Sequence, residues 1–273
     1  MIRHRFKANR PKITRPTDIK PYWQVIEKIV DDSNIVLEVL DARMPELSRN
    51  EKIEKMCEEK NKPLILILNK SDLVPSQLLN NTVKKLKKSY SVFEISSKEK
   101  LGTKRLRDYI LRVGKENKEK TFFRVGIVGY PNTGKSSITN VLVGRKKALV
   151  TSKAGTTKGQ QWVKFRENIQ IIDSPGVIPI EDKDEVRLSL IGSKNPEKIH
   201  DKEEVVRRIV NILKETNSIE ELYKIKVEKE DDFFDIVEKI GKKKGLLKKG
   251  GEINENQIYV QLIRDWQQGK LRQ

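Results

Sequence analysis

Residues 124–136 read RVGIVGYPNTGKS, and this stretch decides the fold. Its first six residues form an apolar run of the kind that makes a buried strand. Residues 129–136 match the P-loop pattern GxxxxGKS, and residues 136–144 (SSITNVLVG) have a helical pattern. A strand, a glycine-rich turn and a helix in this order predict a phosphate-binding cradle, because backbone N–H groups at such a turn can surround phosphate oxygens. The alternative is an accidental glycine pattern, which the strand and the helix argue against.

Each polar residue of the P-loop has an expected role. Lys135 is predicted to neutralise the β and γ phosphate oxygens and to stabilise charge during catalysis, and the Ser136 hydroxyl is predicted to ligate Mg²⁺. The residues predicted to contact the nucleotide in this stretch are Asn132, Thr133, Gly134, Lys135, Ser136 and Ser137.

The base must be recognised elsewhere, because all nucleotides carry phosphates. Asn69-Lys70-Ser71-Asp72 follows the apolar run LILIL (64–68), at the strand end where open α/β sheets bind ligands. The Asp72 carboxylate can accept both the N1–H and the exocyclic N–H of guanine, so this stretch predicts guanine recognition by Asn69, Lys70 and Asp72. A helix-start cap is the alternative reading of such a short motif.

Three further short segments complete the predicted site. Ser96, Ser97 and Lys98 follow the run VFEI (92–95) and are predicted to bring a backbone N–H to the guanine O6 atom. Asp173-Ser-Pro-Gly176 closes the run NIQIID, and we expect Asp173 to hold Mg²⁺ and the Gly176 N–H to sense the γ-phosphate. A loop at residues 153–158 is predicted to supply a second Mg²⁺ hydroxyl from Thr157, with Thr156 as the alternative.

These motifs follow one another in a permuted order. In an ordinary GTPase the P-loop comes first, whereas here the Asn-Lys-Ser-Asp and Ser-Ser-Lys segments precede it. A nucleotide-binding domain cut before the strand that ends at Leu40, and rejoined through residues 114–120, gives this order without moving any group in space. The fold class is therefore α/β: a circularly permuted P-loop GTPase domain with a mostly parallel sheet and helices on both faces, followed by a small all-α domain.

The domain boundaries follow from the changes in pattern along the chain. Residues 1–17 are predicted to form a basic arm, residues 18–180 the GTPase domain and residues 181–273 a helical, RNA-binding domain. Helical stripes support the last assignment: Val205, Val206, Ile209, Val210 and Leu213 form one, and Ile258, Leu262 and Trp266 form another. Trp266 is expected to pack in the core, with stacking on a base as the alternative.

Composition narrows the partners and the location. The 273 residues contain 57 Lys and Arg against 39 Asp and Glu, a formal charge of +18 that favours a polyanionic partner, with nucleic acid first. A solvated cationic surface is the alternative. Cys57 is the single cysteine and no long apolar run is present, so a soluble, cytoplasmic protein is expected, with no membrane partner. A monomer is the expected oligomeric state.

The permuted order resembles the YlqF/YawG family of circularly permuted GTPases. Asp41-Ala-Arg-Met-Pro45 with Ser48-Arg49-Asn50 is similar to the family's DARxP signature, and residues 155–162 and 246–253 are similar to other family patterns. The resemblance implies a role in assembling the large ribosomal subunit, with the C-terminal helices touching ribosomal RNA. Bacterial members carry an N-terminal histidine near the attacking water; neither His4 nor His200 matches it, so no catalytic histidine is assigned.

The residue after Gly176 is Val177, where many GTPases carry a water-orienting glutamine, so slow intrinsic hydrolysis stimulated by the partner is expected. Asn132 resembles the asparagine with which related GTPases hold K⁺, although it could instead only shape the turn. The basic residues predicted to bind RNA phosphates, besides the N-terminal arm, are Lys242, Lys243, Lys244, Lys248, Lys249, Arg264, Lys270 and Arg272. Two other hypotheses stay open: a regulatory GTPase acting on protein partners, and a nucleic-acid-binding module with a vestigial nucleotide site.

Overall fold

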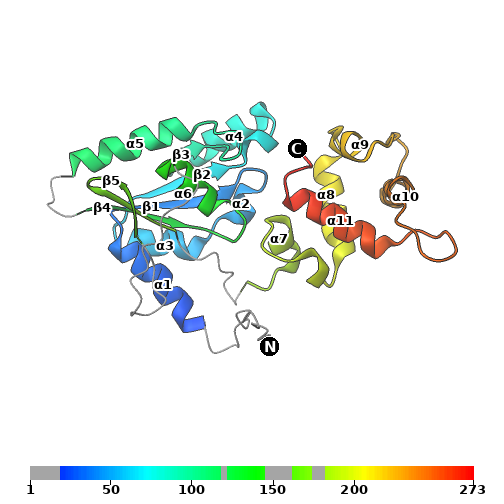
Figure 1. Cartoon of the computed structure of the whole chain (residues 1–273), viewed down its shortest axis with the longest axis horizontal. Helices are drawn as coiled ribbons and strands as arrows, with labels where there is room; N and C mark the ends of the chain where they lie inside the picture. Colours follow the sequence, from blue (N-terminus) through cyan, green and yellow to red (C-terminus); the bar gives the residue numbers. More distant parts are fainter. Residues whose placement is uncertain (1–18, 118–121, 145–161, 174–181) are drawn as a thin grey trace, which may run out of the picture.

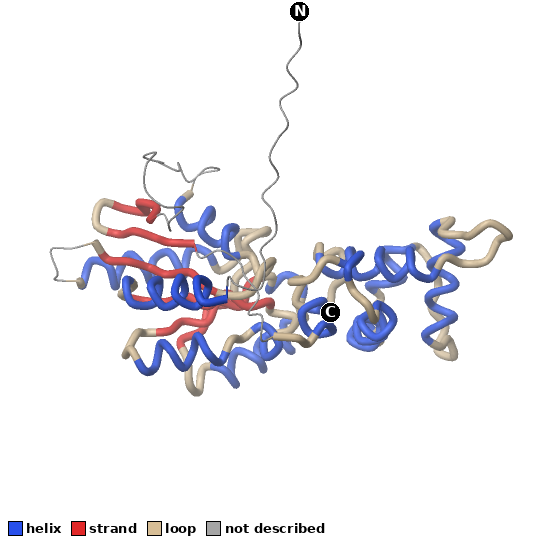
Figure 2. The backbone as a smooth tube through the Cα atoms, turned by 90° about the horizontal axis from the view of Figure 1, so that it is seen from below, coloured by secondary structure: helices blue, strands red, loops and turns tan. Residues whose placement is uncertain are grey.

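The computed structural model of the chain describes residues 19–117, 122–144, 162–173 and 182–273. These residues form a sheet covered by helices and, beside it, a separate group of helices (Figure 1). In the view turned by 90° the strands all lie in the first of these parts (Figure 2). The predicted basic arm, part of the 114–120 connector and the predicted boundary at residue 180 lie outside the described residues.

The described residues contain six strands, which form one sheet in the order β3-β2-β1-β4-β6-β5. The strands are β1 (Ile35–Asp41), β2 (Leu64–Asn69), β3 (Ser91–Glu94), β4 (Phe123–Val128), β5 (Trp162–Arg166) and β6 (Ile169–Asp173). All neighbouring pairs are parallel except β5 with β6, which form an antiparallel edge. The order confirms the predicted fold class, because the strands that precede the P-loop strand β4 lie on one side of it and the later ones on the other.

Both faces of the sheet are apolar and both are covered, as the continuous apolar runs predicted. Leu37 and Val39 of β1 face the helices α5 (Thr103–Glu116) and α6 (Lys135–Val143). Val36 and Leu40 point the other way, toward the helices α1 (Ile19–Asp32), α3 (Glu51–Glu59) and α4 (Ser76–Leu86). The short helix α2 (Pro45–Ser48) and the 3-10 turn η2 (Ser71–Leu73) follow β1 and β2 at the carboxyl edge of the sheet.

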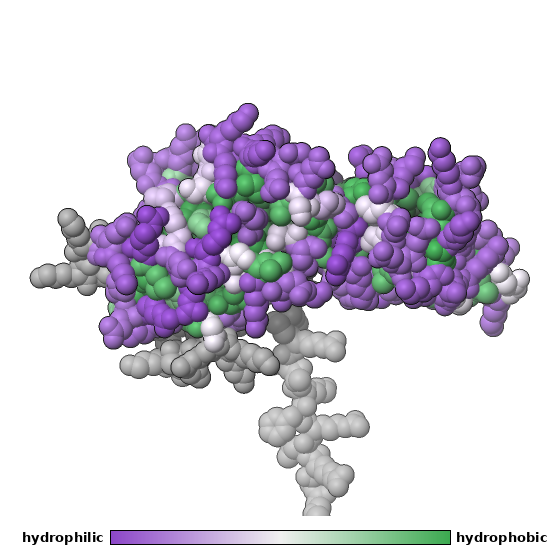
Figure 3. Space-filling view, turned by 90° about the horizontal axis from the view of Figure 1, so that it is seen from above, coloured by the Kyte–Doolittle hydropathy of each residue, from purple (hydrophilic) through white to green (hydrophobic). Residues whose placement is uncertain are grey.

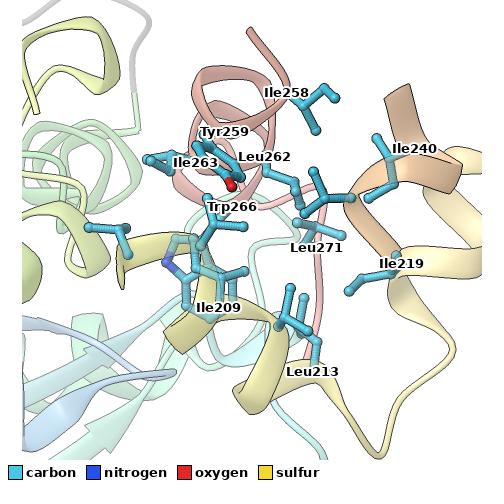
Figure 4. Packing of buried hydrophobic residues seen from close by; sticks show 14 of the residues in the cluster. Ile209, Leu213, Ile219, Ile240, Ile258, Tyr259, Leu262, Ile263, Trp266 and Leu271 are labelled. Carbon is cyan, nitrogen blue, oxygen red and sulfur yellow. The ribbon is translucent and has the colours of Figure 1, made fainter. Parts of the chain in front are cut away.

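The helical part consists of α7 (Glu185–Leu190), the 3-10 turn η3 (Pro196–Lys198), α8 (Lys202–Leu213), α9 (Ser218–Tyr223), α10 (Phe233–Lys244) and α11 (Glu255–Gln267). Both predicted stripes lie in its core, which Figure 4 shows from close by. Trp266 is fully buried there, and its indole N–H donates to the Leu190 carbonyl at 2.8 Å. The prediction that Trp266 packs inside is therefore confirmed. No helix in the described part of the chain is long and apolar enough to cross a membrane.

Candidate nucleotide-binding site

The P-loop connects β4 to α6 at the carboxyl edge of the sheet, and two glycines allow its shape. Gly129 has φ +137°, and a Cβ there would stand 2.6 Å from the carbonyl oxygen of Val39 on the neighbouring strand. Gly134 has φ +102°, and a Cβ there would stand 2.1 Å from Nδ2 of Asn69. Both positions therefore require glycine, for backbone conformation and for space.

Asn69 joins the P-loop to the Ser-Ser-Lys turn. Its buried side chain donates from Nδ2 to the carbonyl of Thr133 at 2.8 Å and accepts at Oδ1 from the N–H of Ser97 at 3.1 Å. Three segments that are far apart in the sequence, at residues 69, 97 and 133, are thus held together by one amide. Of the residues predicted to meet one ligand, Asn69, Ser97 and Thr133 therefore lie side by side.

The loop itself is closed by its own side chains. Lys135 is 6% exposed, and its ammonium donates to the Tyr130 carbonyl at 2.8 Å. The Thr133 hydroxyl donates to the same carbonyl at 2.9 Å. A buried lysine held in this way faces the cradle with its charge in place before any ligand arrives.

Two adjoining cavities lie at this edge. The first, of about 200 Å³, is lined by Asn69, Lys70, Asp72, Leu73, Ser97, Lys98, Asn132, Gly134, Ser137, Gln267, Gln268 and Gly269. The second, of about 620 Å³, is lined by Lys70, Pro131, Asn132, Gly134, Lys135, Ser136, Ser137, Arg264, Gln267 and Gln268. We call them the base cavity and the phosphate cavity. Their walls share Lys70, Asn132, Gly134, Ser137, Gln267 and Gln268, so one ligand can occupy both.

The base cavity has a carboxylate in its wall. No residue in the described ranges donates a hydrogen bond to the Asp72 side chain, which leaves both of its oxygens available to a base. Of the Ser-Ser-Lys turn, Ser97 and Lys98 line the cavity, whereas Ser96 is fully buried behind it and its hydroxyl accepts from the Glu99 N–H at 3.0 Å. Ser96 therefore shapes the turn.

The oxygen ligands predicted for Mg²⁺ can be placed only in part. Ser136 is in the first turn of α6, and β6 ends at Asp173, which pairs with Ile127, two residues before Gly129. A serine hydroxyl is an oxygen ligand of the kind that Mg²⁺ prefers. Thr156, Thr157, Gly176 and Val177 lie outside the described residues. Among the described residues no group of three or more His, Cys, Asp and Glu side chains could hold a metal by itself.

A buried charged cluster beside the site was not predicted from the residues themselves. Asp41, fully buried at the end of β1, accepts from Arg43 Nη2 at 2.8 Å and from Lys70 Nζ at 2.7 Å. Burial would raise the pKa of Asp41, but the Arg43 guanidinium and the Lys70 ammonium outweigh it and hold the pKa well below its ordinary value. The sequence feature that could have indicated this cluster is the Asp41-Ala-Arg43 stretch, which directly follows the apolar run of a predicted buried strand.

Arg43 extends this cluster to the helical part. Its guanidinium stacks 3.9 Å from the ring centre of Trp266 and donates to the Trp266 carbonyl at 2.6 Å. Lys70 belongs to the predicted guanine motif, so Asp41, through Arg43, connects that motif to α11.

A larger cavity of about 870 Å³ is lined by one P-loop residue, Tyr130, and otherwise by residues outside the P-loop. It is therefore not the candidate site.

Comparison with known proteins decides the family. A family model described as "RsgA GTPase" matches residues 7–181, and one described as "50S ribosome-binding GTPase" matches residues 124–242. These two matches and the strand order of the sheet together establish the family. The chain belongs to the circularly permuted GTPases.

Relatives of this circularly permuted GTPase include proteins named as GTP-binding proteins. An uncharacterized GTP-binding protein of Methanocaldococcus jannaschii is 41% identical over 92% of this chain and 66% of its own length. Nucleolar GTP-binding protein 2 of Pneumocystis carinii is 33% identical over 92% of this chain and 53% of its own length. The chain thus spans between half and two thirds of these relatives.

The structure is similar to YlqF from T. maritima. The GNP-bound form superposes with a TM-score of 0.65 at 27% identity, covering 92% of this chain and 94% of that one. The GDP-bound form gives 0.62 at 29% identity, with 90% and 94% covered. The predicted family and fold are confirmed, and membership supports the prediction of a GTP-hydrolysing enzyme.

Proposed function

We propose that this circularly permuted GTPase binds GTP across the two adjoining cavities and hydrolyses it to GDP and phosphate. The observation that carries the proposal is the bridge made by Asn69 between Thr133 and Ser97, which fixes the base cavity and the phosphate cavity side by side. Asp72 then faces guanine, and Lys135 with the backbone of the P-loop faces the β and γ phosphates.

Hydrolysis in this site depends mainly on positioning and charge. Lys135 and the N–H groups at the start of α6 stabilise the negative charge that spreads over the phosphate oxygens. Ser136, Thr157 and Asp173 would hold Mg²⁺, which when bound neutralises phosphate charge. Val177 can do no acid-base chemistry, so intrinsic turnover is slow. Replacing Lys135 by Ala should abolish GTP turnover, measured as phosphate release, and unchanged turnover would contradict the site.

We infer further that the polyanionic partner is the large ribosomal subunit and its RNA. Five lysines are exposed at the end of α10 and in the turn after it: Lys242, Lys243, Lys244, Lys248 and Lys249. We call these residues the lysine loop. It connects α10 to α11 on the side of the helical part away from the sheet (Figure 1). Such a projecting cationic turn suits contact with phosphates, whose binding is electrostatic and independent of sequence.

The remaining basic residues named from the sequence differ in their surroundings. Arg272 is exposed, Lys270 pairs with Asp265 at 2.8 Å and Arg264 pairs with Glu197 at 2.9 Å. In the lysine loop Lys242 pairs with Glu238 at 2.9 Å, whereas none of the described residues forms an ion pair with the other four lysines. The space-filling view shows polar side chains over most of both parts of the molecule (Figure 3). The lysine loop is therefore the segment on which RNA binding is proposed.

Co-sedimentation with ribosomal subunits tests the partner. The chain loaded with a nonhydrolysable GTP analogue should sediment with large subunits or their precursors, and the GDP-loaded chain should do so less. Absence from particles in both states would contradict a role in assembly and favour a regulatory GTPase acting on proteins. Undetectable GTP binding would favour a nucleic-acid-binding module with a vestigial site.

Potassium dependence is a separate proposal. Asn132 has φ +61°, and its side-chain amide donates to the Gly192 carbonyl of the helical part. If Asn132 also holds K⁺ beside the phosphates, turnover should fall when Na⁺ replaces K⁺. Equal turnover in the two salts would leave Asn132 as a residue that shapes the loop and contacts the turn after α7. A cytoplasmic location and a monomeric state complete the proposed picture.

A further inference from the structure

The last turn of α11 forms part of the wall of both cavities. Gln267 and Gln268 line the base cavity and the phosphate cavity alike, although they come from the helical part and lie more than 100 residues after the P-loop. A nucleotide bound in these cavities would therefore touch side chains from two parts of the molecule.

Arg264 brings a positive charge to the phosphate cavity. It lies in the same wall as Lys135, Ser136 and Ser137, the P-loop residues that face phosphate oxygens. Its guanidinium pairs with Glu197 at 2.9 Å, and both partners are well exposed, at 41% and 66%. Exposed ion pairs of this kind contribute little to stability, so the guanidinium can exchange this partner for a phosphate.

The position of Arg264 is fixed by the packing of α11. Trp266, two residues later, is fully buried and is held by Leu190 and by Arg43. The Gln267 amide donates to the carbonyls of Ser189 and Lys194, each at 3.0 Å. These contacts anchor the end of α11 directly after Arg264, which lines the phosphate cavity.

We propose that Arg264 binds the polyphosphate chain of the bound nucleotide, so that the helical part supplies a second cation to the site besides Lys135. The proposal rests on the nucleotide site proposed above. A guanidinium can form two parallel charge-assisted hydrogen bonds with a phosphate, which Lys135 cannot. Because the nucleotide would then join the two parts of the molecule, its binding would stabilise their mutual arrangement.

Affinity measurements on the full chain test this role. Arg264→Ala should raise the Kd for a nonhydrolysable GTP analogue about tenfold or more, the usual effect of losing a hydrogen bond to a charged group. The Kd for GDP should rise less, because GDP carries one phosphate fewer. Arg208→Ala is the matched control: Arg208 is an exposed arginine on α8 that pairs with Glu204 and lines neither cavity.

Glu197→Gln separates phosphate binding from a structural ion pair. This variant breaks the same pair but keeps the guanidinium, so GTP-analogue affinity should stay unchanged or increase. If Arg264→Ala and Glu197→Gln weaken binding of the GTP analogue equally, the ion pair itself determines the affinity. That result would overturn the proposal. Circular dichroism of each variant checks that it is folded, and Arg264→Lys should restore part of the affinity.

Lys135→Ala distinguishes the two levels of the proposal. If it loses nucleotide while Arg264→Ala binds like the wild type, the site stands and the role of Arg264 is wrong. If both variants bind like the wild type, the site and the role of Arg264 both fail.

Discussion

Asn69 and Gly134 approach each other so closely that neither can change without disturbing the site. A Cβ at position 134 would stand 2.1 Å from Asn69 Nδ2, the atom that donates to Thr133. The contact between the guanine motif and the P-loop is therefore possible only with glycine at that position.

Gly134→Ala should abolish detectable GTP binding, because the new methyl group displaces Asn69 and separates the two cavities. Gly144→Ala is the matched control: Gly144 also has a positive φ, +73°, but no atom of the described residues lies within 4 Å of its added Cβ. The control should cost about 1 kcal/mol of stability and leave nucleotide affinity intact. Isothermal titration with GTP measures the nucleotide affinity of the two variants. Normal binding by Gly134→Ala would contradict the described contact between Gly134 and Asn69.

The buried Asp41 should make stability depend on pH. Its pKa is lowered by Arg43 and Lys70, so its contribution to stability is fully present above the unfolded pKa of about 4 and is lost as the pH falls toward the folded pKa. Asp41→Asn should cost about 3–5 kcal/mol at pH 7, because it leaves the Arg43 cation buried without its partner.

Urea unfolding at several pH values checks this prediction. The difference between wild type and Asp41→Asn should shrink as the pH falls below about 4, because unfolded wild type then binds a proton at Asp41 while the folded protein still holds the carboxylate charged. Asp32→Asn, at an exposed pair with Lys28, should change stability by less than about 1 kcal/mol. A constant difference down to pH 3 would show that the charge of Asp41 is not what stabilises the fold.

Among the elements, the lysine loop offers the clearest test of RNA contact. Lys248 and Lys249 are adjacent and exposed in the turn between α10 and α11. Replacing both by Gln should weaken binding to ribosomal RNA. The logarithm of the RNA association constant falls linearly with the logarithm of the salt concentration, and the magnitude of this slope should decrease by about 1.5, since each phosphate contact contributes roughly 0.7–0.9. Replacing Lys87 and Lys88, an equally exposed pair after α4, should leave the slope unchanged. Equal slopes in all three proteins would exclude the loop from the interface.

The strands and the convergence of motifs at their ends could be predicted, because apolar runs specify buried strands and parallel strands bring their carboxyl ends to one edge. The two helical stripes specified the core of the helical part in the same way. The Arg43 to Trp266 contact could not be predicted, since it depends on how two separately formed cores pack. The position of α11 over the cavities has the same origin, so the sequence did not indicate Gln267 or Gln268 as site residues.

In the whole molecule, residues between 182 and 193 form hydrogen bonds with Tyr130 and Pro131 of the P-loop. The Tyr130 hydroxyl donates to Asp182 at 2.8 Å and accepts from Arg187 of α7 at 3.1 Å, and the Ser193 hydroxyl donates to the Pro131 carbonyl at 3.1 Å. The chain end returns to the guanine motif, where the Gln273 N–H donates to the Leu73 carbonyl at 2.9 Å. A change in the P-loop can therefore reach the helices directly, and any effect of nucleotide on a partner's affinity must be matched by an equal effect of the partner on the nucleotide.

We propose that Asp72 and the P-loop around Lys135 hold the two ends of one guanine nucleotide. The most direct measurement is the affinity of Asp72→Asn for GTP and for XTP, whose base carries an oxygen where guanine carries the exocyclic amine. An asparagine amide can donate to that oxygen, so GTP affinity should fall by about a hundredfold and XTP affinity should rise above that of the wild type. If Asp72→Asn binds GTP as tightly as the wild type and XTP no better, Asp72 does not recognise the base and the account is wrong.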